Sequence, residues 1–143
     1  MLREAAADFS WVFIDCPAGF EGTINLFAPC ADMGVVVATP DAPSLRGAER
    51  MAASLFLQGI NQVRLVVNRV RPRLAQRGFA VNIDDAMDSV GLPLLGYIPE
   101  DEQVIVSAAR GMPTAGGKAK SAARAYENIA CRLMGKSAPL MRL

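Results

Sequence analysis

Histidine is absent from this sequence, and its absence removes several classes of active site. Without it, Ser-His-Asp and Cys-His catalysis are excluded, along with the commonest metal ligand. The three cysteines, Cys16, Cys30 and Cys131, are widely spaced and form no Cys-x-x-Cys pair, so neither a disulfide framework nor a zinc ribbon is indicated. Any chemistry must therefore rest on carboxylates, lysine, amides and a bound metal.

Long apolar runs and an excess of charge are absent as well. No apolar run approaches the roughly 20 residues that span a bilayer, and the N-terminus lacks the basic-then-apolar pattern of a signal peptide. The 15 basic and 14 acidic residues leave a net charge of +1, so no overall field attracts nucleic acid or anionic lipid. The composition, 52% hydrophobic, predicts one globular domain over residues 1–143 in a reducing cytoplasm.

Four short apolar runs, rich in β-branched residues, predict strands that are covered on both faces. They are residues 11–16, 34–39, 63–68 and 94–98. Segments with helical spacing lie between and after them, at about 22–31, 44–58, 83–90, 102–109 and 119–134. This alternation predicts an α/β fold with a parallel sheet of about four strands, right-handed crossovers and flanking helices.

Several finer expectations concern individual residues. Ser44 is expected to cap the helix at 44–58, and the basic, turn-forming residues 72–78 predict a surface loop. Trp11, Cys16 and Cys30 lie in apolar surroundings and are expected in the core. The buried stripe of the helix at 44–58 is predicted to consist of Leu45, Ala48, Ala52, Leu55 and Phe56.

The glycine-rich loop with a lysine that cradles phosphate is also missing. Residues 12–19 combine an apolar strand, a carboxylate at its end and a turn, which is half of a nucleotide site. The nearest approach to the other half, residues 111–119, has its lysine one position too late, no hydroxyl residue after it and no apolar strand before it. We therefore predict that residues 111–119 form a loop.

Functional groups suited to a nucleotide follow several of the predicted strands, and parallel sheets bind ligands at this end. Asp15 suits a magnesium-bound water, and the amide of Gly19 allows close approach of a terminal phosphate. Asn68 offers the donor and acceptor needed to read an adenine edge, and Pro99 would flank the base. Each also has a structural explanation, as a turn residue, a cap or a helix start.

The same segments, in the same order, resemble the MinD-type ATPases of the ParA/MinD deviant P-loop family. The matching segments are residues 12–21, 38–46, 67–72, 98–105 and 125–135, so the similarity covers nearly the whole chain. The resemblance implies an incomplete P-loop NTPase-type, Rossmann-like three-layer domain. It further implies ATP and Mg as cofactors and an ATP-dependent homodimer. In the intact family this dimer meets division-site regulators, associates reversibly with the inner membrane surface and helps to place the septum.

The resemblance assigns roles to particular residues. Asp15 would assist magnesium and the attacking water, and Gly19 would contact the terminal phosphate. The base-binding strand ends would supply four residues: Asn68, Arg69, Pro99 and Glu100. The helix tied to dimerisation and regulator contact would present Arg46, Glu49 and Arg50.

This sequence departs from the family pattern in three places. The deviant P-loop would lie before Met1, the amphipathic membrane helix would lie beyond Leu143, and Gly47 stands where the family usually has aspartate. The strand of the phosphate loop would lie between the strands that end at Asp15 and Thr39, so its absence leaves two apolar edges. We expect that the chain alone neither binds ATP tightly nor hydrolyses it.

Two alternatives stay open from the sequence. The chain can be a non-catalytic binding module that pairs with a full-length homologue. It can also be a relative that serves DNA partition or flagellar positioning, for which a basic cluster would contact phosphate. That cluster consists of Arg69, Arg71, Arg73 and Arg77, and we expect a solvated loop with no specific nucleic-acid partner.

Overall fold

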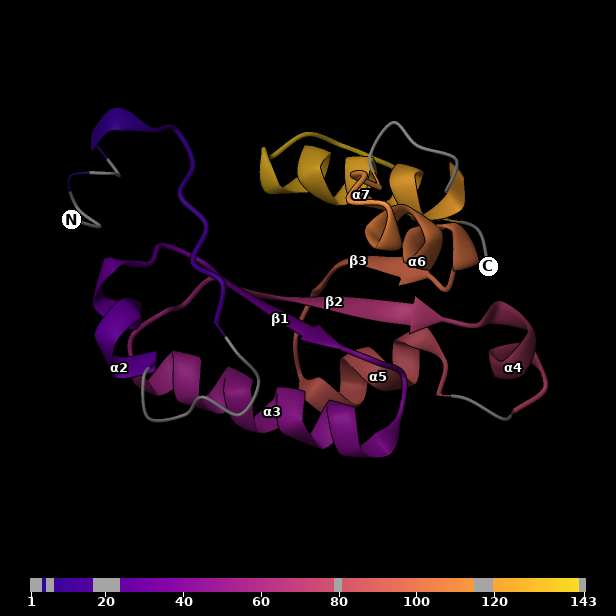
Figure 1. Ribbon diagram of the computed structural model, residues 1–143. Coiled ribbons are helices and arrows are strands. Elements are labelled where there is room, and N and C mark those ends of the chain that lie inside the picture. The colour runs from indigo at the N-terminus through magenta and orange to yellow at the C-terminus, as the bar shows by residue number, and fades with distance from the viewer. Residues whose placement is uncertain (1–3, 5–6, 17–23, 79–80, 115–119, 142–143) are drawn as a thin grey trace.

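The computed structural model is a three-layer α/β arrangement in which helices cover both faces of a small sheet (Figure 1). It describes residues 4, 7–16, 24–78, 81–114 and 120–141. The strands are β1 (Gly34–Ala38), β2 (Val63–Val70) and β3 (Leu94–Pro99). The longer helices are α3 (Ala42–Leu57), α5 (Ile83–Val90), α6 (Glu102–Ala109) and α7 (Lys120–Leu133).

The sheet is parallel throughout and has the order β1-β2-β3. Gly34 pairs with Val63 and Ala38 with Val67, so β1 ends opposite Val67 and β2 continues beyond it to Val70. The β2–β3 register is irregular and ends with Val70 opposite Pro99. Because all three strands point the same way, the residues that follow them meet at the carboxyl end of the sheet (Figure 1). The predicted α/β class and parallel sheet are confirmed.

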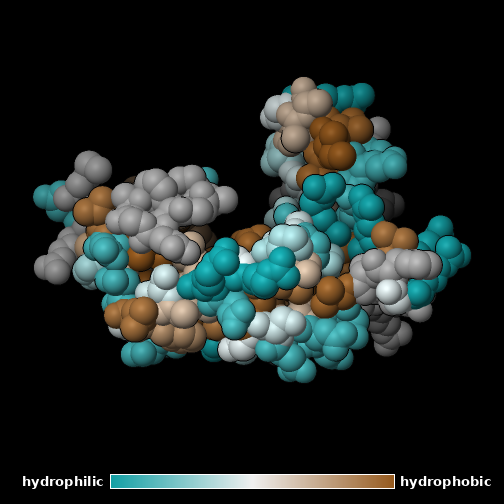
Figure 2. Space-filling view, turned by 90° about the horizontal axis from the view of Figure 1, so that it is seen from below, coloured by the Kyte–Doolittle hydropathy of each residue, from teal (hydrophilic) through white to brown (hydrophobic). Residues whose placement is uncertain are grey.

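Two apolar clusters hold the layers together. The larger one lies between the sheet and helices α3 and α5, and in β2 it includes the fully buried Leu65 and Val67. The smaller one joins Val66, Leu95 and Ile98 to the inner face of α7. Both faces of β2 are covered, and all five of its apolar residues are buried, which agrees with the apolar run from which the strand was predicted. The face seen from below carries hydrophilic and apolar residues side by side (Figure 2).

The two edges of the sheet differ. At the β3 edge, Arg132 donates to the carbonyl of Leu95 at 2.8 Å and to that of Ala138 at 2.7 Å, and the hydroxyl of Tyr97 donates to the carbonyl of Met141. At the β1 edge, Val35 and Val37 remain 41% and 60% exposed. Within the described ranges β1 pairs on one side only. The strand at this side of the sheet therefore keeps one apolar face exposed.

The prediction of a strand over residues 11–16 is wrong for this structure. These residues are extended but have no strand partner, so the sheet contains three strands within the described part of the chain. Trp11 is half exposed and stacks on Phe13, with 6.2 Å between the ring centroids. Cys16 and Cys30 are exposed too, so the predicted burial of these three residues is wrong. An apolar run becomes a buried strand only where a neighbouring strand can pair with it.

The helical predictions need smaller corrections. The segment 22–31 forms a short helix α2 (Ile24–Phe27) followed by a 3-10 turn η1 (Ala28–Cys30). The basic segment predicted as a loop contains a short helix, α4 (Pro72–Gln76). The cap of α3 is Asp41 and not Ser44, because the carboxylate of Asp41 accepts from the amide of Ser44 at 3.0 Å. Phe56 is exposed, while the other four members of its predicted stripe are buried.

The remaining elements lie close to their predicted positions. Helices α5 and α6 have the predicted bounds, and α7 differs from its prediction by one residue at each end. Gly135 follows α7 with a φ of 71°, as expected for a residue that ends a helix. Among the described residues, no helix combines the length and hydropathy required to cross a bilayer.

Candidate functional site: the carboxyl ends of the strands

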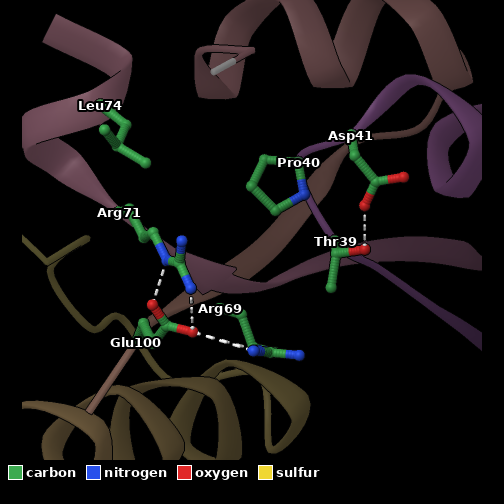
Figure 3. A pocket seen from close by; sticks show the side chains of 7 residues that line it. All are labelled: Thr39, Pro40, Asp41, Arg69, Arg71, Leu74 and Glu100. Atoms are coloured by element: carbon green, nitrogen blue, oxygen red, sulfur yellow. Dashed lines mark hydrogen bonds and ion pairs between the residues drawn. The ribbon is translucent and has the colours of Figure 1, made fainter. Parts of the chain in front are cut away.

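Residues that follow all three strands line one open cavity of about 240 Å³. Figure 3 shows these side chains around the space between the α3 N-terminus, α4 and the end of β3. The lining residues are Thr39, Pro40, Asp41, Arg69, Arg71, Leu74 and Glu100. The sequence predicted that the strand ends would lie together, and three of the four do so.

Glu100 joins the ends of β2 and β3. Its carboxylate accepts from Arg69 Nη2 at 3.0 Å and from Arg71 Nη2 at 3.0 Å, and it also forms an ion pair with Arg71 Nε. The hydrogen bonds from Arg71 and then from Arg69 lower the pKa of Glu100 from 4.5 to about 2. The carboxylate is therefore ionised at neutral pH and neutralises part of the local basic charge.

The end of β1 is held by a local network. The carboxylate of Asp41 accepts hydrogen bonds from the hydroxyl of Thr39 and from the amide of Ser44. Both bonds lower the pKa of Asp41, the one from Thr39 more strongly. In return, the hydroxyl of Ser44 accepts from the amide of Thr39 at 3.0 Å. These bonds fix the turn from β1 into α3, so one wall of the cavity is rigid.

Asn68 and Pro99 lie at the ends of β2 and β3 but outside the residues that line the cavity. Both are partly buried, and the Oδ1 of Asn68 accepts from the amide of Arg69 at 2.9 Å. Arg69 and Glu100, which were predicted from the same strand ends, do line the cavity and contact each other. The predicted contacts of these four residues with a base stay predictions.

The phosphate side of the predicted site is not assembled in this structure. Asp15 is exposed, lies in segment 11–16, which has no strand partner among the described residues, and lines neither the cavity at the strand ends nor the one between α3 and α5. Gly19 lies outside the described residues, and so does the 115–119 part of the segment predicted as a loop. The described residues contain no cluster of three or more acidic or cysteine side chains able to hold a metal. The magnesium role of Asp15 stays a prediction.

A second cavity, of about 200 Å³, lies between α3 and α5. Arg46 and Glu49, two of the residues predicted for dimer or regulator contact, line it together with Leu45 and Val81. Arg50, the third, is exposed on the same helix but does not line this cavity. The helix face thus offers a hollow with one positive, one negative and several apolar side chains.

Sequence reasoning did not single out Arg71 as a site residue. It treated Arg71 only as one of four arginines in a basic cluster, whereas the structure pairs Arg71 and Arg69 with Glu100. Arg71 directly follows β2 and Glu100 directly follows β3. Their shared position at the strand ends is the signal from which the contact could have been predicted. The pairing also reduces the free positive charge of the cluster and so weakens the argument for nucleic-acid binding.

Comparisons with known proteins agree with this geometry. The profile of the CobQ/CobB/MinD/ParA nucleotide binding domain matches residues 8–114. A protein from Mesostigma viride that carries the MinD name is 43% identical over 95% of this chain and 48% of its own length. The septum site-determining protein MinD of Bacillus subtilis is 38% identical over 100% of this chain and 54% of its own.

Solved structures lead to the same family. The MinC:MinD cell division protein complex of Aquifex aeolicus contains a chain that superposes with a TM-score of 0.90 at 28% identity, over 98% of this chain and 58% of the other. The present chain thus spans about half the length of the curated relatives it matches. From the profile match, the ordered motifs and the parallel sheet together, we conclude that the chain belongs to the CobQ/CobB/MinD/ParA nucleotide-binding family.

Proposed function

We propose that this chain is the base-binding portion of a MinD-like ATPase that helps to place the division septum. The sequence match to MinD proteins over nearly the whole chain supports this role. The structural observation that carries the proposal concerns β1, whose end lines the cavity: within the described residues its outer side has no strand partner, and Val35 and Val37 on one of its faces are exposed. An edge of this kind accepts a further parallel strand.

The strand expected at that edge is the one that leads into a phosphate loop. ATP carries several negative charges, and tight binding needs backbone amides and a lysine aimed at the phosphates. At the cavity, the described residues offer two arginines, both of which are already paired with Glu100. Asp41 adds a negative charge there. We therefore expect Mg-ATP to bind tightly only when another polypeptide segment supplies the phosphate loop.

A complementation experiment tests this proposal. The chain is titrated with fluorescent ATP and Mg²⁺, first alone and then together with the part of the Bacillus subtilis relative that precedes the matched region. We expect a dissociation constant of about 1–10 µM for the pair and at least about 100-fold weaker binding by the chain alone. Low-micromolar binding by the chain alone, or none by the pair, contradicts the proposal.

A matched pair of variants locates the docking edge. Val37→Glu places a charge on the exposed apolar side of β1, and Leu57→Glu places the same charge at the exposed end of α3. We expect the first variant to abolish complementation and the second to retain it. Equal behaviour of the two variants would show that β1 is not the edge used.

The partners of the intact protein belong to the same proposal. The cavity on α3 lined by Arg46 and Glu49 is the surface we assign to division-site regulators and to the ATP-dependent homodimer. Its mixture of charged and apolar groups suits a protein partner. Exchanging the two charges, by Arg46→Glu and Glu49→Arg together, should abolish capture of a MinC-type regulator by the complemented complex. Membrane association would be carried by a segment outside these 143 residues.

Pairing with an intact homologue is a second candidate, favoured by the same open edge of β1. In this case the chain would take the place of the equivalent portion of a full-length homologue and bind to the rest of that protein. Size-exclusion chromatography of the mixture with a full-length MinD distinguishes the candidates. A stable mixed complex that forms without added nucleotide favours the second one.

A further inference from the structure

A series of contacts connects Glu100, which follows β3, to Asn68, which lies near the end of β2. The Oε1 atom of Glu100 accepts from both Nε and Nη2 of Arg69, at 3.3 and 3.0 Å, while Arg71 binds the same carboxylate through two nitrogens. The amide of Glu100 also donates to the carbonyl of Val70 at 2.9 Å. One side chain therefore ties the ends of β2 and β3 together at the rim of the cavity (Figure 3).

Arg69 has an unusual backbone conformation. Its φ is 57°, and it is the one non-glycine residue with a positive φ in the described part of the chain. The left-handed region is unfavourable for a side chain with a Cβ, so the surrounding contacts must hold it. Arg69 lies in the irregular stretch of β2 between Val67 and Val70, and it makes two contacts there: the ion pair with Glu100, and the bond from its amide to the Oδ1 of Asn68.

The second of these contacts orients the Asn68 side chain. Because Oδ1 accepts from the Arg69 amide, a flipped side chain would place the NH₂ group against an N–H donor. The Nδ2 group is therefore the end directed away from Arg69, and it has no hydrogen-bond partner within the described ranges. Asn68 offers a ligand chiefly a donor.

We propose that Glu100 is a positioning residue of the nucleobase site, acting through Arg69 on Asn68. The carboxylate holds Arg69 in its left-handed conformation, Arg69 fixes the amide of Asn68, and the Nδ2 group then donates to a ring nitrogen of the base. This inference rests on the proposed function, since it assumes that the ends of β2 and β3 bind a base. It adds a specific order of dependence among three side chains.

Adenosine is the appropriate probe, because it carries the base but no phosphate. Binding to the chain is measured by saturation-transfer NMR with adenosine at up to about 10 mM, a range suited to dissociation constants near 1 mM. Hydrogen exchange of the Arg69 amide is followed in the same samples. We expect Glu100→Gln to weaken adenosine binding about fivefold and to speed exchange of this amide about tenfold. The control, Glu102→Gln, removes the same charge from an exposed site two residues later and should change neither quantity.

Two further variants separate positioning from a general effect on stability. Asn68→Asp keeps an acceptor for the Arg69 amide but removes the donor, so it should lose adenosine binding while the amide stays protected. Arg69→Gly adopts a positive φ without strain, so it no longer needs Glu100. In that background Glu100→Gln should change adenosine binding less than about twofold. A merely structural role of Glu100 would give the same fivefold effect in both backgrounds.

The outcomes distinguish this inference from the proposed function. If Glu100→Gln binds adenosine as well as the wild-type chain while Asn68→Asp does not, the positioning role is overturned and the base site remains. If the wild-type chain shows no saturation transfer to adenosine at about 10 mM, the inference fails together with the base site on which it rests. The complementation experiment above then decides separately whether the chain forms part of an ATP site.

Discussion

Gly96 gives the sharpest test of how α7 packs on the sheet. A Cβ built on Gly96 would lie 2.5 Å from Cγ1 and 3.2 Å from Cδ1 of Ile129, whereas two carbon atoms in contact prefer about 3.5–4.0 Å. Gly96→Ala therefore requires a shift of about 1 Å or more. Ile129 cannot turn away easily, because a β-branched side chain on a helix has essentially one favourable χ1.

The expected cost follows from these distances. Overpacking of a well-filled core costs about 1–3 kcal/mol, and the loss of backbone freedom in the unfolded chain returns about 0.4–1 kcal/mol. Gly96→Ala should therefore lower the free energy of unfolding by about 1–2 kcal/mol. Urea denaturation followed by circular dichroism measures this change through the midpoint, provided that the slope is unaltered.

A double-mutant cycle decides whether Ile129 is the cause. Ile129→Ala removes the two offending atoms and leaves the Cβ of residue 129 at 3.9 Å from the new methyl group, which is an ordinary contact. In that background Gly96→Ala should be neutral or slightly stabilising, with a coupling energy of about 1 kcal/mol or more. An equal cost of Gly96→Ala in both backgrounds would refute the packing of α7 on β3 described here.

Three further predictions use the same denaturation assay. The pKa of Glu100 is about 2 in the folded chain and near 4.5 when unpaired, so its ion pairs stabilise the fold fully above pH 4.5 and are lost as the pH falls toward 2. Glu100→Gln should therefore flatten the loss of stability between these two pH values, and Glu102→Gln should not. Gly47→Ala lies inside α3 with nothing within 4 Å of the new methyl group, and it should stabilise by about 0.5–1 kcal/mol as judged by the urea midpoint. Arg132→Ala leaves the carbonyls of Leu95 and Ala138 without their donor and should cost about 1.5–3 kcal/mol, whereas Arg124→Ala, exposed on the same helix, should cost less than about 0.5 kcal/mol.

The sequence predicted the parts of the fold that depend on local pattern. Four of the six residues in the run 63–68 are apolar and all four are buried, so the burial and the strand conformation of this run follow from one observation. Helix α5 was predicted from its helical spacing with the bounds that the structure has, where Asn82 caps its start and Gly91, with a φ of 69°, ends it. Local chemistry determines such elements, and a single sequence contains all of it.

The parts that were missed depend on what lies beside a segment in space. Residues 11–16 have the apolar pattern of a strand, yet the pattern does not reveal whether a neighbouring strand is there to pair with them. The bond of Arg71 to Glu100 joins residues 29 positions apart, and the positive φ of Arg69 has no glycine to signal it. The candidate site was therefore predicted as a set of strand ends, while the ion pairs within it required the structure.

The contrast between the two sheet edges unites these observations. A parallel sheet exposes backbone donors and acceptors at each edge, and proteins normally cover or blunt them. Here Arg132 binds one backbone carbonyl of β3, that of Leu95, and the Tyr97 hydroxyl binds Met141, whereas within the described ranges β1 has no such contact on its outer side and keeps Val35 and Val37 exposed. Covering the exposed parts of Val35 and Val37 would contribute about 2–3 kcal/mol, because full burial of one such side chain is worth about 1.5–3 kcal/mol. A further strand beside β1 that ends in a phosphate loop would place that loop at the carboxyl end of the sheet, together with Thr39, Arg69 and Glu100. The strand that stabilises the fold would then also complete the proposed nucleotide site.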